Sequence, residues 1–510
     1  MSKKTLLKGT AILTIAGILT RLLGFFYRIF LSNILGAENL GIYQLIFPVY
    51  SICYNIYATA IQTAISSFVA LELGKKHYKN VPKVLRIGLF ISISSAVLLS
   101  LIVFFKADFI ASNIIYEPRS AASLKILAIV FPFCGITSCI NGYYYGLTKS
   151  GVPATTQLFE QIVRVSLVYA MALFVGKGNL KLTTELAVLG MVIGEISSTV
   201  YNILSYHLTY DTRQITNNAK RSTIRAHSTS FMTKSILKMS VPLTINRLIV
   251  SILFSMEAIL IPNMLRKYGL SSAEALSIYG IINGMAMPFI MFPSTVTNSL
   301  SVLLLPTISE ATATNNNYSI RKTISLSVKY SLLVGILSTG IFVFFGKELG
   351  VRIFNNSLTG DYLTILAWIC PFLYITTTFS SILNGLDKIH LSFISSVSSL
   401  TLRILLILFL VPLNGTYGYF LSLLVSQLLM TAFEFYLIYK IINPPFDAIN
   451  TIVKPGFLVI LLGLTLKEAY IYFTPKYGGI KLLLFFCLAF TIIYLLLLRI
   501  TNVISAKDFK

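Results

Sequence analysis

The sequence contains little charge for its length. Of 510 residues, 12% are charged and 55% are hydrophobic, whereas about a quarter of the residues in a soluble domain are charged. A water-soluble chain of this size needs far more polar surface to cover its core. This shortage excludes a soluble enzyme and predicts a polytopic protein of the inner membrane.

The chain also lacks the patterns of metal and nucleotide chemistry. Its five cysteines lie in apolar runs without metal-ligand spacing, and its four histidines are scattered near the faces that we expect to be cytoplasmic. No Gly-rich loop leads to Lys-Ser or Lys-Thr, so the chain does not carry the motif for ATP hydrolysis. We therefore predict no metal site, no cofactor and no enzymatic activity.

Long hydrophobic runs take up most of the sequence. About twenty apolar residues in a helix cross a hydrocarbon core of about 30 Å, and fourteen such runs can be placed. The first is too long for a cleaved signal peptide, and no connecting segment is long enough to fold by itself. The runs cover residues 9–35, 41–73, 84–106, 120–147, 152–175, 184–209, 236–265, 273–308, 319–345, 361–385, 390–411, 415–440, 455–473 and 480–499.

The net charge of +23 is unevenly distributed along these runs. If the N-terminus is cytoplasmic and the loops alternate, 23 of the 41 Lys and Arg lie on the inner side and 12 on the outer side. Cytoplasmic loops are enriched in Lys and Arg, so this bias places both termini in the cytoplasm. Attraction to anionic membrane lipid explains the surface charge, and nucleic acid is not an expected partner.

Short motifs recur about 240 residues apart. Residues 138–142 read Ser-Cys-Ile-Asn-Gly and residues 381–385 read Ser-Ile-Leu-Asn-Gly. Leu147-Thr-Lys leads to Arg164 and Leu386-Asp-Lys leads to Arg403, each Arg lying 17 residues after its Leu. The recurrence predicts two six-helix bundles with the same orientation, related by a pseudo-two-fold axis along the membrane normal. Such a pair of bundles is a transporter architecture.

These observations together predict an all-α membrane protein in four parts. The expected parts are an N-terminal six-helix bundle (1–210), a basic cytoplasmic linker (211–235), a C-terminal six-helix bundle (236–442), and two further transmembrane helices with a short cytoplasmic tail (443–510).

Charges inside predicted helices mark a candidate substrate site, because a charge at mid-membrane costs at least ~2.5 kcal/mol. Arg21 and Arg28 are seven residues apart, which places them on one helix face about 10 Å apart. The nearest acid, Glu38, is at the outer end of that helix. Snorkelling towards the interface could explain Arg28 but explains the central Arg21 poorly. We expect both to face a cavity.

The other intramembrane charges allow more than one interpretation. Glu160 and Arg164 are four residues apart, which favours a local ion pair. Arg247 could pair with Glu257 or face the cleft, and Arg403 could line the cavity or bridge to Glu434. Glu195 and Glu257 are candidates for proton or cation coupling, but a hydrogen-bonded structural carboxyl explains Glu195 equally well.

A polar stripe follows the second hydrophobic run. Gln44, Asn55 and Gln62 lie at intervals of 11 and 7 residues, so they return to one helix face. Amides next to arginines suit a polar ligand with sugar hydroxyls, and we include these three among the substrate-binding candidates. Ordinary hydrogen bonding between membrane helices would produce the same stripe.

Several motifs carry a family resemblance that covers the whole chain. The motifs are Lys8-Gly-Thr, Thr20-Arg-Leu-Leu-Gly-Phe, Leu35-Gly-Ala, Gly41-Ile-Tyr, Ser299-Leu-Ser and Leu305-Pro-Thr-Ile-Ser-Glu-Ala. In these motifs the chain resembles the MurJ/SpoVB group of the multidrug/oligosaccharidyl-lipid/polysaccharide (MOP) exporter superfamily, and within it the stage V sporulation protein B branch.

The resemblance implies a flippase for undecaprenyl-pyrophosphate-linked oligosaccharides, most simply the peptidoglycan precursor lipid II. The group's first-helix arginines match Arg21 and Arg28, with one extra residue between them. Two departures make the cavity less cationic: Ile46 stands where the group has an arginine before Pro48, and no arginine occurs between 273 and 308. Cell-wall synthesis proteins are further possible partners.

Four alternatives remain open at this stage. A teichoic-acid or capsule precursor could replace lipid II as the substrate. A cation-coupled multidrug antiporter of the same superfamily is the nearest rival, although two arginines and no Asp in the first helix favour an anionic ligand. A membrane-embedded glycosyl or acyl transferase is disfavoured by the short outer loops. A scaffold for cell-wall synthesis that transports nothing is the fourth.

The charge bias generates a topology prediction. Single cysteines at Ser222 and Ser319 should react with impermeant thiol reagents only from the cytoplasmic side, and one at Ser357 only from outside. The measurement is thiol labelling of intact cells against inverted vesicles. Labelling of Ser222 from outside intact cells would reverse the predicted orientation.

Overall fold

A computed structural model describes residues 3–177, 183–209, 213–215, 217–218, 227–314 and 316–504. Within these ranges the regular structure is helical, and no β-strand is present. The chain forms two compact units, Met1–Ile259 and Leu260–Lys510. This agrees with the predicted all-α class.

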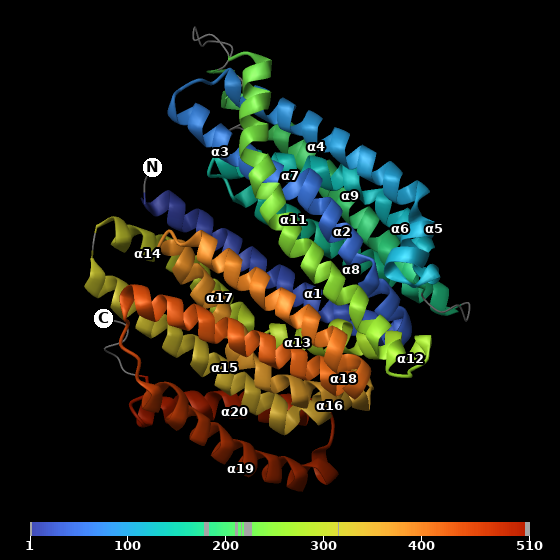
Figure 1. The fold of residues 1–510 in the computed structure, drawn as a ribbon, viewed down its shortest axis with the longest axis vertical. Helices are drawn as coiled ribbons and strands as arrows, with labels where there is room; N and C mark the ends of the chain where they lie inside the picture. Colours follow the sequence, from blue (N-terminus) through green and yellow to red (C-terminus); the bar gives the residue numbers. More distant parts are fainter. Residues whose placement is uncertain are drawn as a thin grey trace. The chain divides into compact units, whose positions relative to one another are not determined.

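The first unit is built mainly from long helices. Figure 1 shows α3, α4, α7 and α9 running side by side, and α3, α4 and α9 each contact α7. Its elements are α1 (Lys3–Leu45), α2 (Phe47–Tyr54), η1 (Asn55–Thr59), α3 (Ala60–Gly74), α4 (Asn80–Phe105), α5 (Ala107–Phe109), η2 (Ile110–Ile115), η3 (Pro118–Ser120), α6 (Ala121–Ala128), α7 (Val130–Gly146), α8 (Gly151–Lys177), α9 (Thr184–Leu208) and most of α11 (Thr229–Lys267).

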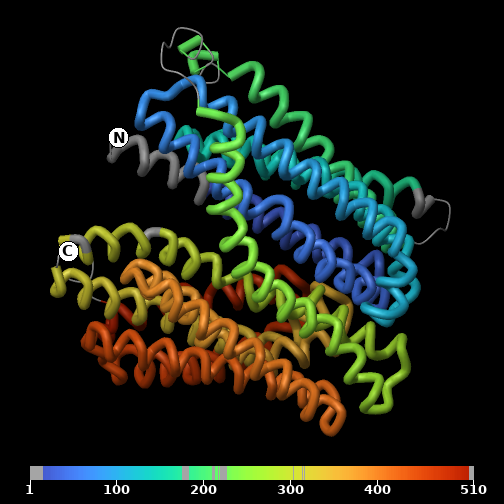
Figure 2. The backbone as a smooth tube through the Cα atoms, turned by 45° about the horizontal axis from the view of Figure 1, so that its top comes forward, coloured from blue at the N-terminus to red at the C-terminus, as the bar shows by residue number. Residues whose placement is uncertain are grey.

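The second unit contains the remaining helices, and its last two, α19 and α20, pack against each other and against α15 (Figure 2). Its elements are α12 (Ser272–Gly280), η4 (Ile281–Ala286), α13 (Met287–Met291), α14 (Ser294–Ala313), α15 (Asn317–Phe354), α16 (Ser357–Leu366), η5 (Ala367–Ile369), α17 (Cys370–Gly385), α18 (Ile389–Ile442), η6 (Ile449–Val453), α19 (Lys454–Tyr477) and α20 (Ile480–Ile500).

Eleven of the described helices are long and apolar enough to cross a membrane, or twelve if the bent pair Pro118–Ala128 and Val130–Gly146 is one span. Two of them, Ile15–Gly74 and Ile389–Ile442, contain 60 and 54 residues. At 1.5 Å per residue, each is long enough for two crossings. The chain is thus a multi-pass membrane protein, and the count of fourteen crossings stays a prediction.

Glycines break these two long spans near the predicted positions. Gly36 (φ 74°, ψ 172°) interrupts α1 directly after the first predicted run, and Gly415 (φ 57°, ψ −133°) interrupts α18 where the twelfth run was expected to begin. Residues other than glycine rarely adopt such angles. By contrast, the run expected at 273–308 is divided into α12, η4, α13 and α14, with Pro288 and Pro293 at the starts of the last two pieces.

The sequence repeat reappears as matched helix ends. After α7 the Thr148 amide bonds to the Tyr145 carbonyl, and the Lys149 amide bonds to the Tyr144 carbonyl. After α17 the Asp387 amide bonds to Asn384, and the Lys388 amide bonds to Leu383 in the same pattern. Thr148 and Asp387 have φ near 60°, so both helices end in Schellman turns.

The repeated Asn-Gly dipeptide serves helix packing in both units. A Cβ atom on Gly142 in α7 would lie 2.6 Å from the Gln62 carbonyl oxygen in α3. A Cβ atom on Gly385 in α17 would lie 2.9 Å from the Ile308 Cβ in α14. Only a residue without a side chain allows these helices to approach so closely.

This packing predicts a contrast between two glycines. Gly142→Ala should lower the free energy of unfolding by about 1–3 kcal/mol, because the backbone of α3 must move away. Gly17→Ala is the matched control, since no described atom beyond its own stretch of helix lies within 4 Å of its added Cβ, and it should be neutral or stabilising by up to about 1 kcal/mol. Thermal unfolding in detergent measures both variants. Equal effects of the two substitutions would contradict the packing argument.

Candidate functional site

A seam of polar side chains joins α11 to the α2–η1–α3 segment inside the first unit. Hydroxyl and amide groups at four-residue intervals lie on one face of the α2–α3 segment, and the matching face of α11 repeats at the same interval. We call this set the polar seam, and its members are Ser51, Asn55, Thr59 and Thr63 with Arg247, Ser251 and Ser255.

Three contacts cross between the two sides of the polar seam. The Ser51 and Ser251 hydroxyl oxygens are 2.9 Å apart. The Ser255 hydroxyl donates to the Pro48 carbonyl at 3.3 Å, and the Arg247 guanidinium donates to the Thr63 hydroxyl at 3.4 Å. A four-residue spacing returns to nearly the same helix face, so one row of side chains on α11 meets one row on the α2–α3 segment.

The α2–α3 side is also bonded along its own axis. Asn55 Nδ2 donates to the Ser51 carbonyl at 3.0 Å, Asn55 Oδ1 accepts from the Thr59 hydroxyl at 2.8 Å, and the Thr63 hydroxyl donates to the Thr59 carbonyl at 3.0 Å. The five residues Asn55–Thr59 form the π-helical turn η1. Such turns loosen the regular backbone ladder and are frequent at functional sites.

Arg21 and Arg28 flank the packed face of α1. Both side chains are exposed, and they lie three residues before and four residues after Gly24. A Cβ atom on Gly24 would be 3.6 Å from Gln161 Nε2 of α8, so the two arginines border the contact between α1 and α8. No hydrogen bond or ion pair joins either guanidinium to another residue in the described part of the chain.

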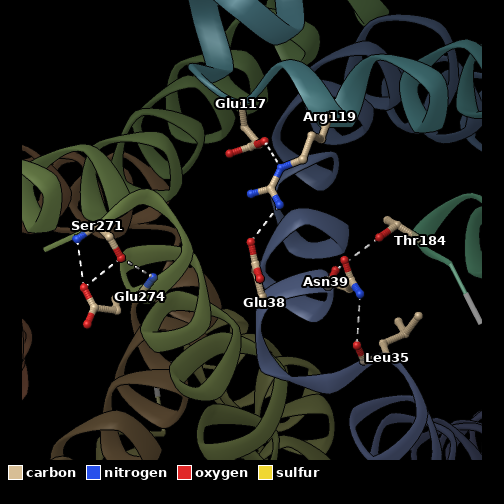
Figure 3. A network of polar contacts seen from close by, with 8 residues as sticks. All are labelled: Leu35, Glu38, Asn39, Glu117, Arg119, Thr184, Ser271 and Glu274. Atoms are coloured by element: carbon tan, nitrogen blue, oxygen red, sulfur yellow. Dashed lines mark hydrogen bonds and ion pairs between the residues drawn. The ribbon is translucent and has the colours of Figure 1, made fainter. Parts of the chain in front are cut away.

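The acid nearest to these arginines along α1 is already bound elsewhere. Glu38 Oε1 accepts from Arg119 Nη1 at 2.7 Å, and the same guanidinium donates from Nε to Glu117 Oε1 at 2.6 Å (Figure 3). Thr184 donates to the neighbouring Asn39 carbonyl. Arg119 therefore takes up the charge of Glu38 and leaves Arg28 without an acidic partner on its helix.

The amide stripe comes together only in part. Asn55 belongs to the polar seam, whereas Gln44 and Gln62 are half-buried and have no side-chain hydrogen bond to the other described residues. The Gln62 backbone instead forms the close contact with Gly142. The seven-residue spacing of Asn55 and Gln62 did not allow for the π turn between them, which adds a residue to the helical period.

A charged cluster lies on α8 and α9. Arg164 pairs with Glu160, as the four-residue spacing predicted. Glu195 is buried, and its carboxyl group contacts Cys134 and Thr137 of α7. The field of Arg164 reaches Glu195 as well as Glu160. Because Arg164 is balanced by an acid, it is poorly suited to bind an anionic ligand.

Arg403 and the remaining acidic candidates are buried in helix packing. Arg403 Nε donates to the Ser426 hydroxyl at 2.8 Å, and Nη2 donates to Gln427 Oε1 at 3.3 Å. The Glu434 carboxylate accepts from Ser380. Arg403 thus forms hydrogen bonds with neutral side chains from the later part of α18. Glu257 is buried on α11.

One group of side chains could hold a metal ion, and the spacing in the sequence did not reveal it. Glu72, His77 and His227 each place a ligand atom within 4.8 Å of the other two. The expectation that the histidines are scattered is wrong for this pair, because residues 150 positions apart meet at the end of α3.

Comparison with known proteins identifies the family. Residues 6–312 match the profile of the family described as polysaccharide biosynthesis protein, and residues 242–409 match the MatE family. The chain belongs to the polysaccharide biosynthesis protein family. Membership confirms the resemblance to the MOP exporter superfamily.

Relatives of this family member match over most of their length. The chain is 26% identical to "Stage V sporulation protein B" of Bacillus subtilis over 84% of this chain and 83% of that protein. It is 21% identical to "Lipid II flippase MurJ" of the same organism over 86% and 83%. A solved structure of "Lipid II flippase MurJ, inward closed conformation" covers 95% of this chain and 97% of its own, with a TM-score of 0.69 at 15% identity, and shows the same fold.

Sequence reasoning missed the hydroxyl members of the polar seam. Ser51, Thr59 and Thr63 share one helix face with Asn55, and Ser251 follows Arg247 by four residues. The signal was present as a four-residue period in two helices. A search for charged and amide side chains alone does not detect it.

The surroundings of two arginines predict different mutant behaviour. Arg403→Ala should lower the free energy of unfolding by about 1–3 kcal/mol, because it leaves buried acceptors without their donor. Arg247→Ala should change it by less than about 0.5 kcal/mol, since the side chain is exposed and has one long contact. Thermal unfolding in detergent compares the two variants. A more destabilising effect at Arg247 would overturn the assignment of roles.

Proposed function

We propose that this family member is a flippase for an undecaprenyl-pyrophosphate-linked oligosaccharide, with lipid II as the first candidate. It would work in the plasma membrane by alternating access, with both termini in the cytoplasm. The observation that carries the proposal is the pair of exposed arginines on α1, neither of which has an acidic partner among the described residues. The similarity to the lipid II flippase MurJ of Bacillus subtilis supports the same substrate class.

The chemistry of the guanidinium group suits a pyrophosphate. Arginine presents a planar set of donors that can bond two phosphate oxygens at once, and it stays charged in a poorly hydrated environment. Arg21 and Arg28 are about 10 Å apart along the helix. Two such groups can hold successive phosphates or follow one phosphate as it moves along α1.

The polar seam supplies groups for the sugar part of the substrate. Its hydroxyls and amides can donate and accept, as a ligand rich in hydroxyls requires. Arg247 is an exposed cation at one end of the polar seam, so it can bind the same anionic headgroup. We assign Asn55 and Arg247 to substrate binding, together with two half-buried amides, Gln44 at the end of α1 and Gln62 in α3.

A second candidate is a cation-coupled multidrug antiporter. The observation that favours it is the buried Glu195 beside Glu160 and Arg164, since a buried acid can hold a proton or sodium ion. The same cluster would couple a flippase to an ion gradient. The arginines on α1 favour the flippase, because a cationic drug would be repelled by them.

Headgroup translocation in liposomes that contain only this protein tests the proposal. Arg21→Ala and Arg28→Ala should each lower substrate affinity about 10- to 150-fold, the equivalent of roughly 1.5–3 kcal/mol for a charge-assisted hydrogen bond. Lys at either position should rescue only partly, because an ammonium keeps the charge and loses the two-pronged geometry. Arg21 should be the more sensitive position.

Arg352→Ala provides the matched control, because Arg352 is an exposed arginine in the last turn of α15. It should translocate the substrate at the wild-type rate. A double Ala variant of Arg21 and Arg28 that translocates normally would refute the phosphate clamp. Gradient-driven efflux of a cationic drug, without headgroup translocation, would instead support the antiporter.

A further inference from the structure

A buried carboxylate stands at the C-terminal end of α3, where an acid is electrostatically disfavoured. Glu72 lies in the last turn of the helix, and its side chain is 6% exposed. The helix dipole is negative at this end, so a cation is expected beside such a group. The following segment offers Lys75, Lys76 and Lys79, yet no Lys or Arg that the structure describes pairs with Glu72.

Two imidazoles face the carboxylate in place of lysine. His77 Nδ1 is 3.0 Å from Glu72 Oε2, and His227 Nε2 is 3.9 Å from Glu72 Oε1. The two rings are 5.5 Å apart at an angle of 74°. Each imidazole thus directs one ring nitrogen towards a different oxygen of one carboxylate.

The backbone holds His77 in this position. The Lys76 amide bonds to the Leu73 carbonyl and the His77 amide bonds to the Glu72 carbonyl, while Lys76 has a φ of 60°. This is the Schellman pattern. It turns the chain back on itself, so that a residue five positions after Glu72 lies over the same turn.

The backbone of His227 is fixed by α4. Its amide donates to Asn80 Oδ1 at 3.0 Å, and its carbonyl accepts from Lys83 Nζ at 2.6 Å. Asn80 is buried and also donates from Nδ2 to Glu72 Oε2 at 2.7 Å. Asn80 therefore orients the Glu72 carboxylate and positions the backbone of His227, as outer-shell residues do at metal sites.

From this geometry we propose that Glu72, His77 and His227 form a site for a transition-metal dication of the Zn²⁺ type. Two imidazoles and one carboxylate are a ligand set found at zinc sites that keep an open fourth position for water. Ligands at 2.0–2.1 Å from a tetrahedral ion are about 3.4 Å apart. The two ring nitrogens lie 3.0 and 3.9 Å from the two oxygens of the Glu72 carboxylate, on either side of that value, and one ligand atom from each residue lies within 4.8 Å of the other two.

The nearby lysines do not prevent binding. Exposed ammonium groups are screened over a Debye length of about 8 Å, whereas the buried carboxylate would touch the ion directly. The Lys83 ammonium is engaged by the His227 carbonyl. A bound ion would fasten the segment leading into α11 to the end of α3, and so would fix the start of the helix that carries half of the polar seam.

Metal titration of the purified full-length protein tests the site. After treatment with a chelator, the wild type should bind one Zn²⁺ per chain by calorimetry, and its melting temperature should rise with added Zn²⁺. His77→Ala and His227→Ala should each weaken binding at least tenfold. His207→Ala and His390→Ala are matched controls, because both side chains are exposed and outside the cluster, and they should bind like the wild type.

Cobalt spectroscopy gives a readout that does not depend on losing a ligand. Co²⁺ bound to the wild type should show ligand-field absorption without a thiolate charge-transfer band, since the five cysteines lie outside the cluster. His77→Cys should retain binding and add that band. Failure of the wild type to bind saturably, or a thiolate band already present in it, would overturn the proposal, as would undiminished binding in both His→Ala variants.

Discussion

Close approach of helix backbones at residues without side chains is the constraint on which the rest of the molecule depends. Lipid provides no hydrophobic force between helices, so packing and interhelical hydrogen bonds must hold them together. The α7 glycines Gly142 and Gly146 meet the backbone of α3 at Gln62 and Ser66. This contact fixes α3, and α3 in turn carries one side of the polar seam and the carboxylate of Glu72.

The first unit contains arginines with acidic partners and arginines without them among the described residues. Arg164 is neutralised by an acid one helical turn away, and Arg119 bridges two acids at a helix end. The arginines on α1 have no such compensation among the described residues. A charge without a partner costs at least ~2.5 kcal/mol inside a membrane. Such a charge is therefore kept only where a ligand or water stabilises it. The family assignment and the charge distribution therefore support the same proposal.

The sequence predicted what depends on neighbours along the chain. Composition and run length predicted the membrane fold, and a four-residue spacing predicted the pair of Glu160 and Arg164. The repeated motifs predicted a correspondence that the Schellman turns at Thr148 and Asp387 confirm. These features follow from local periodicity, and a single sequence contains that information directly.

Contacts between distant segments could not be predicted in this way. Arg403 was assigned to a cavity or to Glu434, and its hydrogen bonds to Ser426 and Gln427 depend on how two helices pack. His77 and His227 are 150 residues apart, and nothing in their spacing indicates that they meet. Only the Schellman turn and the buried Asn80 bring them to one carboxylate.

The extent of α11 bears on how the first unit is completed while the chain is being made. By sequence, α11 opens the second repeat, but its first 31 residues belong to the first compact unit. The growing chain must therefore extend well past the end of the first repeat before the first unit has all of its helices.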